Sequence, residues 1–507
     1  MALLAYAAFA LVALAGPGRG VQRGLGLRPD AALVLPIGLV VCAAAQAVGL
    51  ALGSSGWTWA LVLGLNLLNF RPLPHGVEPR GDAASWRGAL VPWLAGLALL
   101  APTQFPWNRV DREGAFLLDP LAPYDDAVFH VGLARELTLG LHPQVPGLSG
   151  IPLGYHLGQG LVRAAALLHA SVEPFDQISR FDPALLTLGL ILALRALVTR
   201  LGYPPLAVTL TGFSLFFTDF SFVFAGQPSA FYWTDLLKGN LLLSLAYVNP
   251  VVPGLLVLLG LLVALARHEA GEGRSWLAVA LLLSAALPHF KVFLGAHLLL
   301  GLAAAALFAS GPEAPRARRT LALVGLPCLL MTLALALGQG GAAVNVVLAP
   351  FDLARITRES LDLPPLSGAA FVGWCALWLF ASLGLRWLGL GPALRALREA
   401  PRAGSVAAAM ALTAWPIGLA FRIAVKDALP GQKVANDAAY IVEQGAPLLW
   451  IFAAVGLAAL AARRGRFVAV ALTLLALPAT VQFVARKSTA PPDRLPADMV
   501  RATAALR

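Results

Sequence analysis

Two adjacent aspartates and a nearby histidine form the segment with the clearest potential for chemistry. Asp125 and Asp126 follow Pro123, and acidic residues after a proline favour the first turn of a helix. His130 comes four residues after Asp126 and therefore lies on the same helix face. Residues that form an apolar stripe on this helix are Phe129, Leu133 and Leu137.

Three interpretations of this segment remain open on local chemistry. Adjacent carboxylates repel each other, so one of them holds its proton more tightly and suits the role of a general base. The pair equally suits the first turn of an ordinary helix at a membrane surface. A divalent-metal site formed by Asp126 and His130 is the third interpretation, although the spacing fixes no third ligand.

The next segment, residues 143–156, contains three prolines and three glycines and predicts an ordered loop without helix. It ends at Tyr155 and His156, which either bind a polar substrate or anchor the chain at the membrane interface. Lys291 follows Pro288 between two apolar runs, where a lysine either reaches to the membrane surface or contacts a phosphate. We expect the other charges at the outer ends of spans to be solvated: Asp219, Asp235, Lys238, Arg355, Arg358, Glu359 and Asp362.

The composition indicates a membrane protein. The chain has 507 residues, of which 59% are hydrophobic and only 12% charged, against about 25% charged in soluble domains. Apolar runs of roughly the length of a transmembrane helix predict an all-α polytopic protein with about fourteen spans: 2–16, 31–53, 55–70, 88–102, 182–203, 205–221, 251–267, 275–290, 292–309, 320–338, 369–388, 406–421, 445–462 and 467–485. The cysteines, Cys42, Cys328 and Cys375, lie inside these runs and indicate neither disulfides nor zinc.

The basic residues predict the orientation. Alternate loops form two sets, and the first has 20 Lys and Arg against 7 Asp and Glu, whereas the second has 17 against 19. The positive-inside rule makes the first set cytoplasmic. Its members are 17–30, 71–87, 195–204, 267–274, 311–320, 386–405 and 463–466. The second set, which we expect to be extracytoplasmic, is 103–181, 222–250, 339–368, 422–444 and the tail 486–507.

The assignment of loops to the two sides of the membrane depends on one segment. Residues 157–172 contain Arg163 and His169, and counting them as a span would reverse every later loop. We therefore predict an amphipathic helix at the outer interface here. The sequence then divides into N-terminal spans (1–102), an extracytoplasmic loop (103–181), a main bundle (182–485) and an extracytoplasmic tail (486–507). Nine of the 26 acids lie between Asp111 and Asp182.

Several function classes lack support. The net charge of +11 is spread over short loops, without the basic stripe and interleaved aromatics of a nucleic-acid binder. The sequence has no Walker A loop, dinucleotide-binding glycine motif, HExxH or GxSxG, so ATP-driven transport and common hydrolase chemistry are unsupported. No pair of broken spans at matching positions favours a secondary transporter.

The stretch DDAVFHVGLARELTLG, residues 125–140, resembles the GT-C superfamily of polytopic glycosyltransferases, especially members that use lipid-phosphate sugars, such as mannosyl- and arabinosyltransferases. In that family an acidic pair opens the first large outer loop. A short helix follows and ends in Ala-x-Glu-Leu/Met-x-x-Gly, here Ala134 to Gly140. The Pro/Gly loop, residues 158–180 and the span from Asp182 continue the resemblance, which covers about 80 residues.

The resemblance implies a GT-C-like bundle and an inverting transferase with its active site on the extracytoplasmic side. The excess of 32 Arg over 5 Lys, with abundant Ala, Leu and Gly, suggests a GC-rich genome and therefore a bacterial inner membrane. Asp125 would be the general base and Asp126 its support. His130, Tyr155, His156 and Lys291 are candidates for substrate binding. The donor would be a polyprenyl-phosphate sugar and the acceptor a glycan, lipid or protein hydroxyl, with no metal or cofactor and no nucleic acid as partner. A transporter or flippase of a lipid-linked or polar substrate, and a non-catalytic membrane subunit, are the alternatives.

Overall fold

The computed structural model describes residues 1–72, 86–119, 124–148, 150–224, 249–311, 314–338, 344–361, 363–399, 402–425 and 436–499. The chain forms two compact units. Unit 1 comprises residues 1–192, 245–260 and 484–507, and unit 2 comprises residues 193–244 and 261–483. Each unit is described by itself below.

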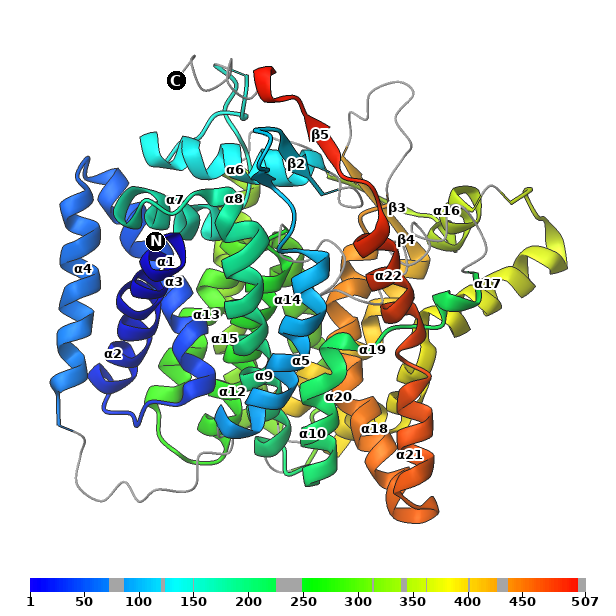
Figure 1. The fold of residues 1–507 in the computed structure, drawn as a ribbon. Helices are drawn as coiled ribbons and strands as arrows, with labels where there is room; N and C mark the ends of the chain where they lie inside the picture. The colour runs from blue at the N-terminus through cyan, green and yellow to red at the C-terminus, as the bar shows by residue number, and fades with distance from the viewer. Residues whose placement is uncertain are drawn as a thin grey trace. The chain divides into compact units, whose positions relative to one another are not determined.

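Unit 1 begins with a bundle of helices and continues into the region that holds the predicted site (Figure 1). Its helices are α1 (Ala2–Phe9), α2 (Gly16–Gly24), α3 (Ala31–Ala51), α4 (Ser55–Leu67), α5 (Trp86–Thr103), α6 (Tyr124–Leu139), α7 (Gly158–Ala170) and α8 (Pro174–Asp176). Three short strands, β1 (Arg109–Val110), β2 (Phe116–Leu118) and β5 (Asp493–Leu495), form an antiparallel sheet in the order β1-β2-β5. The helices α9 (Asp182–Arg200) and α12 (Val251–Glu269) begin in unit 1.

Unit 2 is a helical bundle with one two-stranded sheet. Its helices are α10 (Pro205–Phe213), α13 (Ser275–Phe290), α14 (Val292–Phe308), α15 (Ala314–Gly338), α16 (Asp352–Ser360), α17 (Gly368–Leu383), α18 (Trp387–Glu399), α19 (Arg402–Ala420), α20 (Ala439–Arg464), α21 (Arg466–Leu474) and the first half of α22 (Pro478–Thr489). The strands β3 (Val344–Leu348) and β4 (Phe421–Val425) pair antiparallel.

The prediction of a helical polytopic chain is confirmed. All fourteen predicted spans fall on helices, and nine helices in the described ranges are long and apolar enough to cross a membrane. Three more, among them α13 and α14, are apolar but shorter. The remaining two predicted spans are α4, which has 13 residues, and α5, which contains two prolines. The chain is therefore a multi-pass membrane protein.

The exposed face of α15 shows why this chain needs lipid around it. Large apolar side chains recur there at helical spacing and are about half exposed: Leu323, Leu326, Leu330 and Leu333. Such a stripe would be costly in water and is the ordinary surface of a helix in a bilayer.

Contacts within unit 1 join loops that the charge count places on the same side. The Arg23 guanidinium donates to the Arg71 carbonyl (3.1 Å), and Arg71 donates to the Gly24 carbonyl (2.7 Å), which links the loops 17–30 and 71–87. On the other side, β2 pairs with β5 of the tail. Lys487 Nζ also lies 2.6 Å from the Asp119 carboxylate, with both side chains buried.

In unit 2 the contacts also join loops that the charge count places on the same side. Arg200 of the turn 195–204 forms an ion pair with Glu272 of the loop 267–274. The opposite loops, 339–368 and 422–444, are joined by the β3–β4 pair and by an ion pair between Asp352 and Arg422. In each unit the contacts group the loops as the positive-inside rule groups them. This agreement supports the alternation of sides, and the assignment of one side to the cytoplasm stays a prediction.

Candidate functional site

The helix that carries the acidic pair begins where the sequence predicts. α6 starts at Tyr124, directly after Pro123, so Asp125 and Asp126 are in its first turn. Their side chains lie outside the described part of the structure. The predicted apolar stripe is confirmed for Leu133 and Leu137, which are fully buried.

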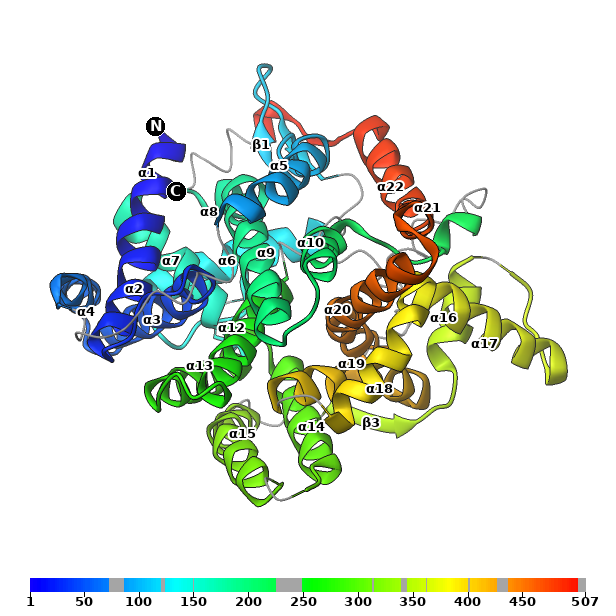
Figure 2. The same ribbon diagram turned by 90° about the horizontal axis from the view of Figure 1, so that it is seen from below.

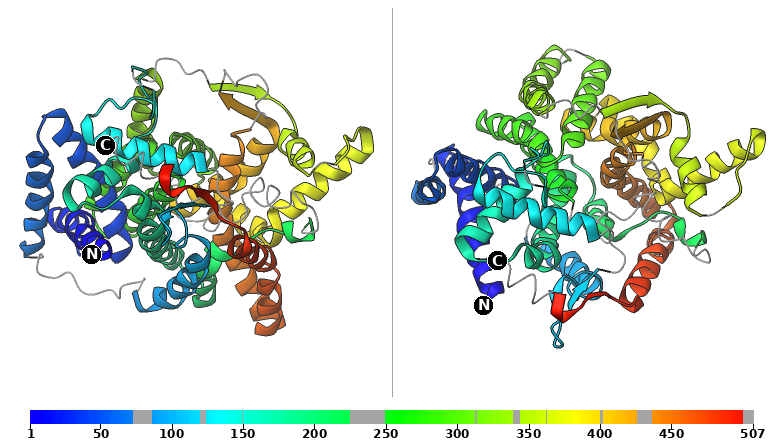
Figure 3. Two further views of the ribbon diagram at one scale, coloured as in Figure 1. Left: turned by 45° about the horizontal axis from the view of Figure 1, so that its top comes forward. Right: turned by 90° about the horizontal axis from the view of Figure 1, so that it is seen from above.

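Two short helices frame this region of unit 1. α6 and α7 run crosswise to α3 and α4 in Figure 1, and the view from above in Figure 3 shows them along their length. α7 packs against both α3 and α6. The predicted helix at 157–172 is therefore confirmed, but most of its residues are buried by neighbouring elements, so it is not a helix that lies free on a membrane surface.

Arg163 shows how α7 tolerates a charge. Its Nε donates to Asp182 Oδ2 (3.0 Å), and Gln159 Nε2 donates to the same oxygen (3.0 Å). The Tyr6 hydroxyl donates to Asp182 Oδ1 (2.8 Å). The arginine and the aspartate are 1% and 5% exposed. This buried, hydrogen-bonded pair fixes α7 to the start of α9 and to α1, because an unpaired charge there would be costly.

The Pro/Gly segment after α6 is an ordered loop, as predicted. The amide of Val145 donates to the Ile151 carbonyl (2.8 Å), and that of Leu153 donates to the Pro143 carbonyl (2.9 Å). Gln144 pairs with Pro152 in an isolated antiparallel bridge. Residue 149 lies outside the described residues. This hairpin brings the chain back against α6, and Tyr155 and His156 lie at the end of the hairpin.

The structure brings three of the predicted site residues together. The His130 and Tyr155 ring centroids are 5.8 Å apart, and the Tyr155 and His156 rings stack at 3.8 Å. Phe129 packs edge-on against Tyr155 at 5.3 Å. Both histidines are buried and Tyr155 is partly exposed. The cluster therefore contains two imidazoles and a phenol, which are polar groups suited to hydroxyl or phosphate recognition.

Two glycines permit this close packing. A Cβ on Gly132 of α6 would lie 2.6 Å from the Pro146 Cβ of the loop, and one on Gly160 of α7 would lie 2.8 Å from a Leu137 methyl group. Neither glycine has a positive φ. Their role is therefore the absence of a side chain where the loop and α7 meet α6.

Gly132→Ala is expected to displace the loop that carries Tyr155 and His156. Overpacking of this kind costs about 1–3 kcal/mol, so we expect a lower melting temperature and faster protease cleavage within 143–156. Gly140→Ala is the matched control, since a Cβ there has nothing within 4 Å. Equal stability and cleavage in the two variants would contradict this packing.

Lys291, the fourth predicted binding residue, lies in unit 2 at the break between α13 and α14. It is extended (φ −158°, ψ 111°) and buried, with Nζ 4.3 Å from the centre of the Tyr440 ring. A cation over an aromatic face is stabilised electrostatically. Lys291 is thus held inside its unit rather than extended along the helix surface.

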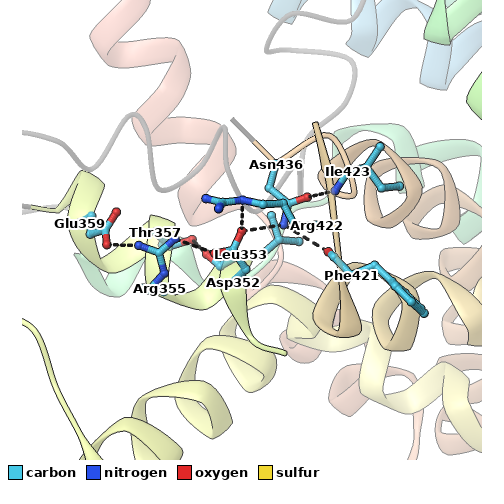
Figure 4. Close-up of polar contacts among 9 residues, drawn as sticks. All are labelled: Asp352, Leu353, Arg355, Thr357, Glu359, Phe421, Arg422, Ile423 and Asn436. Carbon is cyan, nitrogen blue, oxygen red and sulfur yellow. Dashed lines mark hydrogen bonds and ion pairs between the residues drawn. The ribbon is translucent and has the colours of Figure 1, made fainter. Parts of the chain in front are cut away.

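A polar network in unit 2 was not predicted from the sequence (Figure 4). Asp352, at the start of α16, accepts hydrogen bonds from Arg355 Nη2 (2.6 Å) and Asn436 Nδ2 (3.0 Å), and its Oδ2 lies 3.0 Å from Arg422 Nε. Asn436 Oδ1 in turn accepts from the Ile423 amide (3.0 Å). Hydrogen bonding to Asp352 raises the pKa of the Arg355 guanidinium. The network joins the two loops on this face.

Asp352→Asn is expected to loosen this junction. The substitution leaves Arg422 without a carboxylate partner among the described residues and Arg355 with Glu359 alone. The loss of charge-assisted hydrogen bonds costs about 1–3 kcal/mol. We expect a lower melting temperature in detergent. Glu359→Gln is the control, because Glu359 pairs only with Arg355 on the exposed side of α16 and is expected to change stability by under about 1 kcal/mol.

One expectation about solvated charges is wrong. Asp219 is completely buried, and its Oδ1 accepts a hydrogen bond from the Ser221 amide (2.9 Å). The burial of Asp219 could not be predicted from the sequence, because tertiary packing alone buries position 219. Asp235, Lys238 and Asp362 lie outside the described residues.

The metal alternative for the acidic pair gains no support. Among the residues that the structure describes, no three His, Cys, Asp or Glu side chains are grouped as metal ligands. Asp126 lies outside that set.

No protein-family model and no curated protein matches the sequence. Solved structures of an oligosaccharyltransferase from Archaeoglobus fulgidus are similar in fold. The apo form has a TM-score of 0.47 at 10% identity, and the complex of this protein, AglB, with an inhibitory peptide and a dolichol-phosphate has 0.46 at 11%. The form tethered to an acceptor peptide containing the NVT sequon has 0.47 at 12%.

Each of these similarities covers 80% of this chain and 56% of the archaeal chain. The chain thus spans little more than half the length of the proteins it resembles. At these TM-scores and identities the similarity does not establish a shared activity. The functional argument therefore rests on the residues of this chain.

Proposed function

We propose that this protein is a membrane glycosyltransferase of the GT-C type. It transfers a sugar from a polyprenyl-phosphate donor to an acceptor hydroxyl on the extracytoplasmic face of a bacterial inner membrane. The observation that carries the proposal is the cluster that His130 of α6 forms with Tyr155 and His156 of the following loop. The first turn of α6 contains Asp125 and Asp126.

In this proposal Asp125 acts as the general base. It takes the proton from the acceptor hydroxyl while that oxygen attacks the anomeric carbon from the face opposite the leaving group. The bond between the anomeric carbon and the phosphate oxygen breaks, and polyprenyl phosphate leaves with inversion of configuration. Asp126 supports the base. General-base catalysis of this kind contributes about 10²–10⁴-fold to a rate.

The polar rings of this cluster have a binding role in this scheme. Tyr155 is partly exposed and stacks on the buried His156, so its hydroxyl is held on a rigid support. Phenol and imidazole groups donate to and accept from sugar hydroxyls, and they donate to phosphate oxygens. Lys291 is a candidate for the phosphate because of its charge and its place in the sequence alone.

The experiment that tests the proposal separates an enzyme from a transporter. Purified full-length protein in liposomes is given a radiolabelled polyprenyl-phosphate sugar and an acceptor panel of glycans, lipids and peptides. Covalent transfer to an acceptor and movement of the donor across the bilayer are measured in the same vesicles. We expect transfer without net donor movement.

Donor movement without transfer would favour a flippase and overturn the proposal. Neither activity across the panel, with a known lipid-phosphate glycosyltransferase active on the same donors, would favour a non-catalytic subunit.

A further inference from the structure

A pocket in unit 2 lies at the ends of five helices and is lined by residues other than those of the candidate site. It has a volume of about 500 Å³ and is formed by the end of α12, the end of α14, the start of α15, the end of α18 and the start of α19. α14, α15, α18 and α19 are grouped in the view from below (Figure 2). Its walls come from three loops, 267–274, 311–320 and 386–405, that the charge count places on the basic side.

Three arginines on three different helices line the pocket: Arg316 of α15, Arg398 of α18 and Arg402 of α19. The carboxylates of Glu269 and Glu399 line the same pocket. Three guanidinium groups against two carboxylates leave the lining with a net positive charge, which is suited to a phosphate.

One carboxylate oxygen in the pocket lacks a hydrogen-bond donor among the described residues. Glu269 Oε2 accepts a hydrogen bond from the Ala403 amide (3.1 Å), which holds the carboxylate in place. Its Oε1 is buried and has no hydrogen-bond partner among the described residues. Buried polar atoms usually have a partner, and an orphaned one indicates a group that completes the site. A hydroxyl close to the phosphate would supply that hydrogen.

The remaining wall is apolar. Ala305, Leu321 and Leu397 are buried side chains that line the pocket. Basic pockets between membrane helices on the cytoplasmic side are where anionic lipid head groups bind. A pocket with three arginines, a buried carboxylate oxygen that lacks a donor among the described residues, and an apolar wall matches a phosphodiester that carries a hydroxyl group and an acyl chain.

We propose that this pocket binds the head group of an anionic glycerophospholipid with free hydroxyls, of which phosphatidylglycerol is the simplest example. The phosphate lies among Arg316, Arg398 and Arg402, and a glycerol hydroxyl donates to Glu269. Binding fixes the ends of α12, α15, α18 and α19 to one another. The site is independent of the proposed transferase chemistry.

The test is a titration of the purified full-length protein with phosphatidylglycerol, followed by native mass spectrometry. Phosphatidylcholine is the lipid control and glycerol 3-phosphate the soluble one. We expect Arg398→Gln and Arg316→Gln each to weaken phosphatidylglycerol binding about five- to tenfold, as expected for one cation at a lipid head group. Both arginines are exposed, so both variants should fold, which circular dichroism verifies.

Arg274→Gln is the matched control, because Arg274 is exposed on the same face but does not line the pocket. It should change the affinity less than twofold. Equal weakening in the Arg274 and Arg398 variants would overturn the proposal. Binding of glycerol 3-phosphate as tight as that of the lipid would assign the pocket to a soluble phosphate ester and overturn the lipid assignment.

Discussion

Asp125→Asn is expected to reduce glycosyl transfer by about 10²–10⁴-fold, the ordinary contribution of a general base. An amide has nearly the shape of the carboxylate but takes no proton from the acceptor hydroxyl. Asparagine is also tolerated near the start of a helix, so α6 should still begin at Tyr124. The effect should therefore fall on kcat, with the KM for the donor little changed.

The measurement is initial rate against donor concentration in liposomes, for wild type, Asp125→Asn and Glu113→Gln. Glu113 is a highly exposed acid in the same unit, next to Arg494, and its variant should retain full activity. A wild-type rate in Asp125→Asn would remove Asp125 from the mechanism.

Arg163→Leu is expected to cause the largest loss of stability among single substitutions in unit 1. It leaves the Asp182 carboxylate buried with only the Tyr6 hydroxyl and the Gln159 amide as donors. Removal of one partner from a buried ion pair costs about 3–5 kcal/mol. We expect a clearly lower melting temperature in detergent, followed by tryptophan fluorescence.

An exposed ion pair and a double variant serve as controls for this loss of stability. Arg135 and Glu173 form an ion pair of similar length, 2.8 Å, with side chains 36% and 52% exposed. Arg135→Leu should therefore cost at most about 1 kcal/mol. The double variant Arg163→Leu/Asp182→Leu should be more stable than Arg163→Leu, because it leaves no unpaired charge. Equal losses at Arg163 and Arg135 would contradict the burial of the first pair.

The features that follow from local sequence were predictable. The start of α6, the ordered Pro/Gly loop and the positions of the helices depend on proline, glycine and apolar run length, which act over a few residues. The charge count groups the loops in the same way as the contacts within each unit do, because loops that meet must lie on one side of a membrane. Which side is cytoplasmic stays a prediction.

The features that depend on tertiary packing were not predictable. Asp352 meets Arg422 and Asn436 across about 70 to 84 residues of sequence, and no short motif indicates such a network. The same holds for the burial of Asp219 and for Arg163, whose partner Asp182 was evident only as another acid of the outer loop. A pocket formed by five helix ends, such as that around Glu269, has no counterpart in any single segment.

The most direct test of the central claim is the chemical balance of the wild-type reaction. Purified protein in liposomes is incubated with a doubly labelled polyprenyl-phosphate sugar, one label in the sugar and one in the phosphate, together with the acceptor panel. We predict that each sugar attached to an acceptor is matched by one molecule of free polyprenyl phosphate. Sugar transfer accompanied by the phosphate label, or no donor consumption while a known enzyme consumes the same donor, would contradict the account.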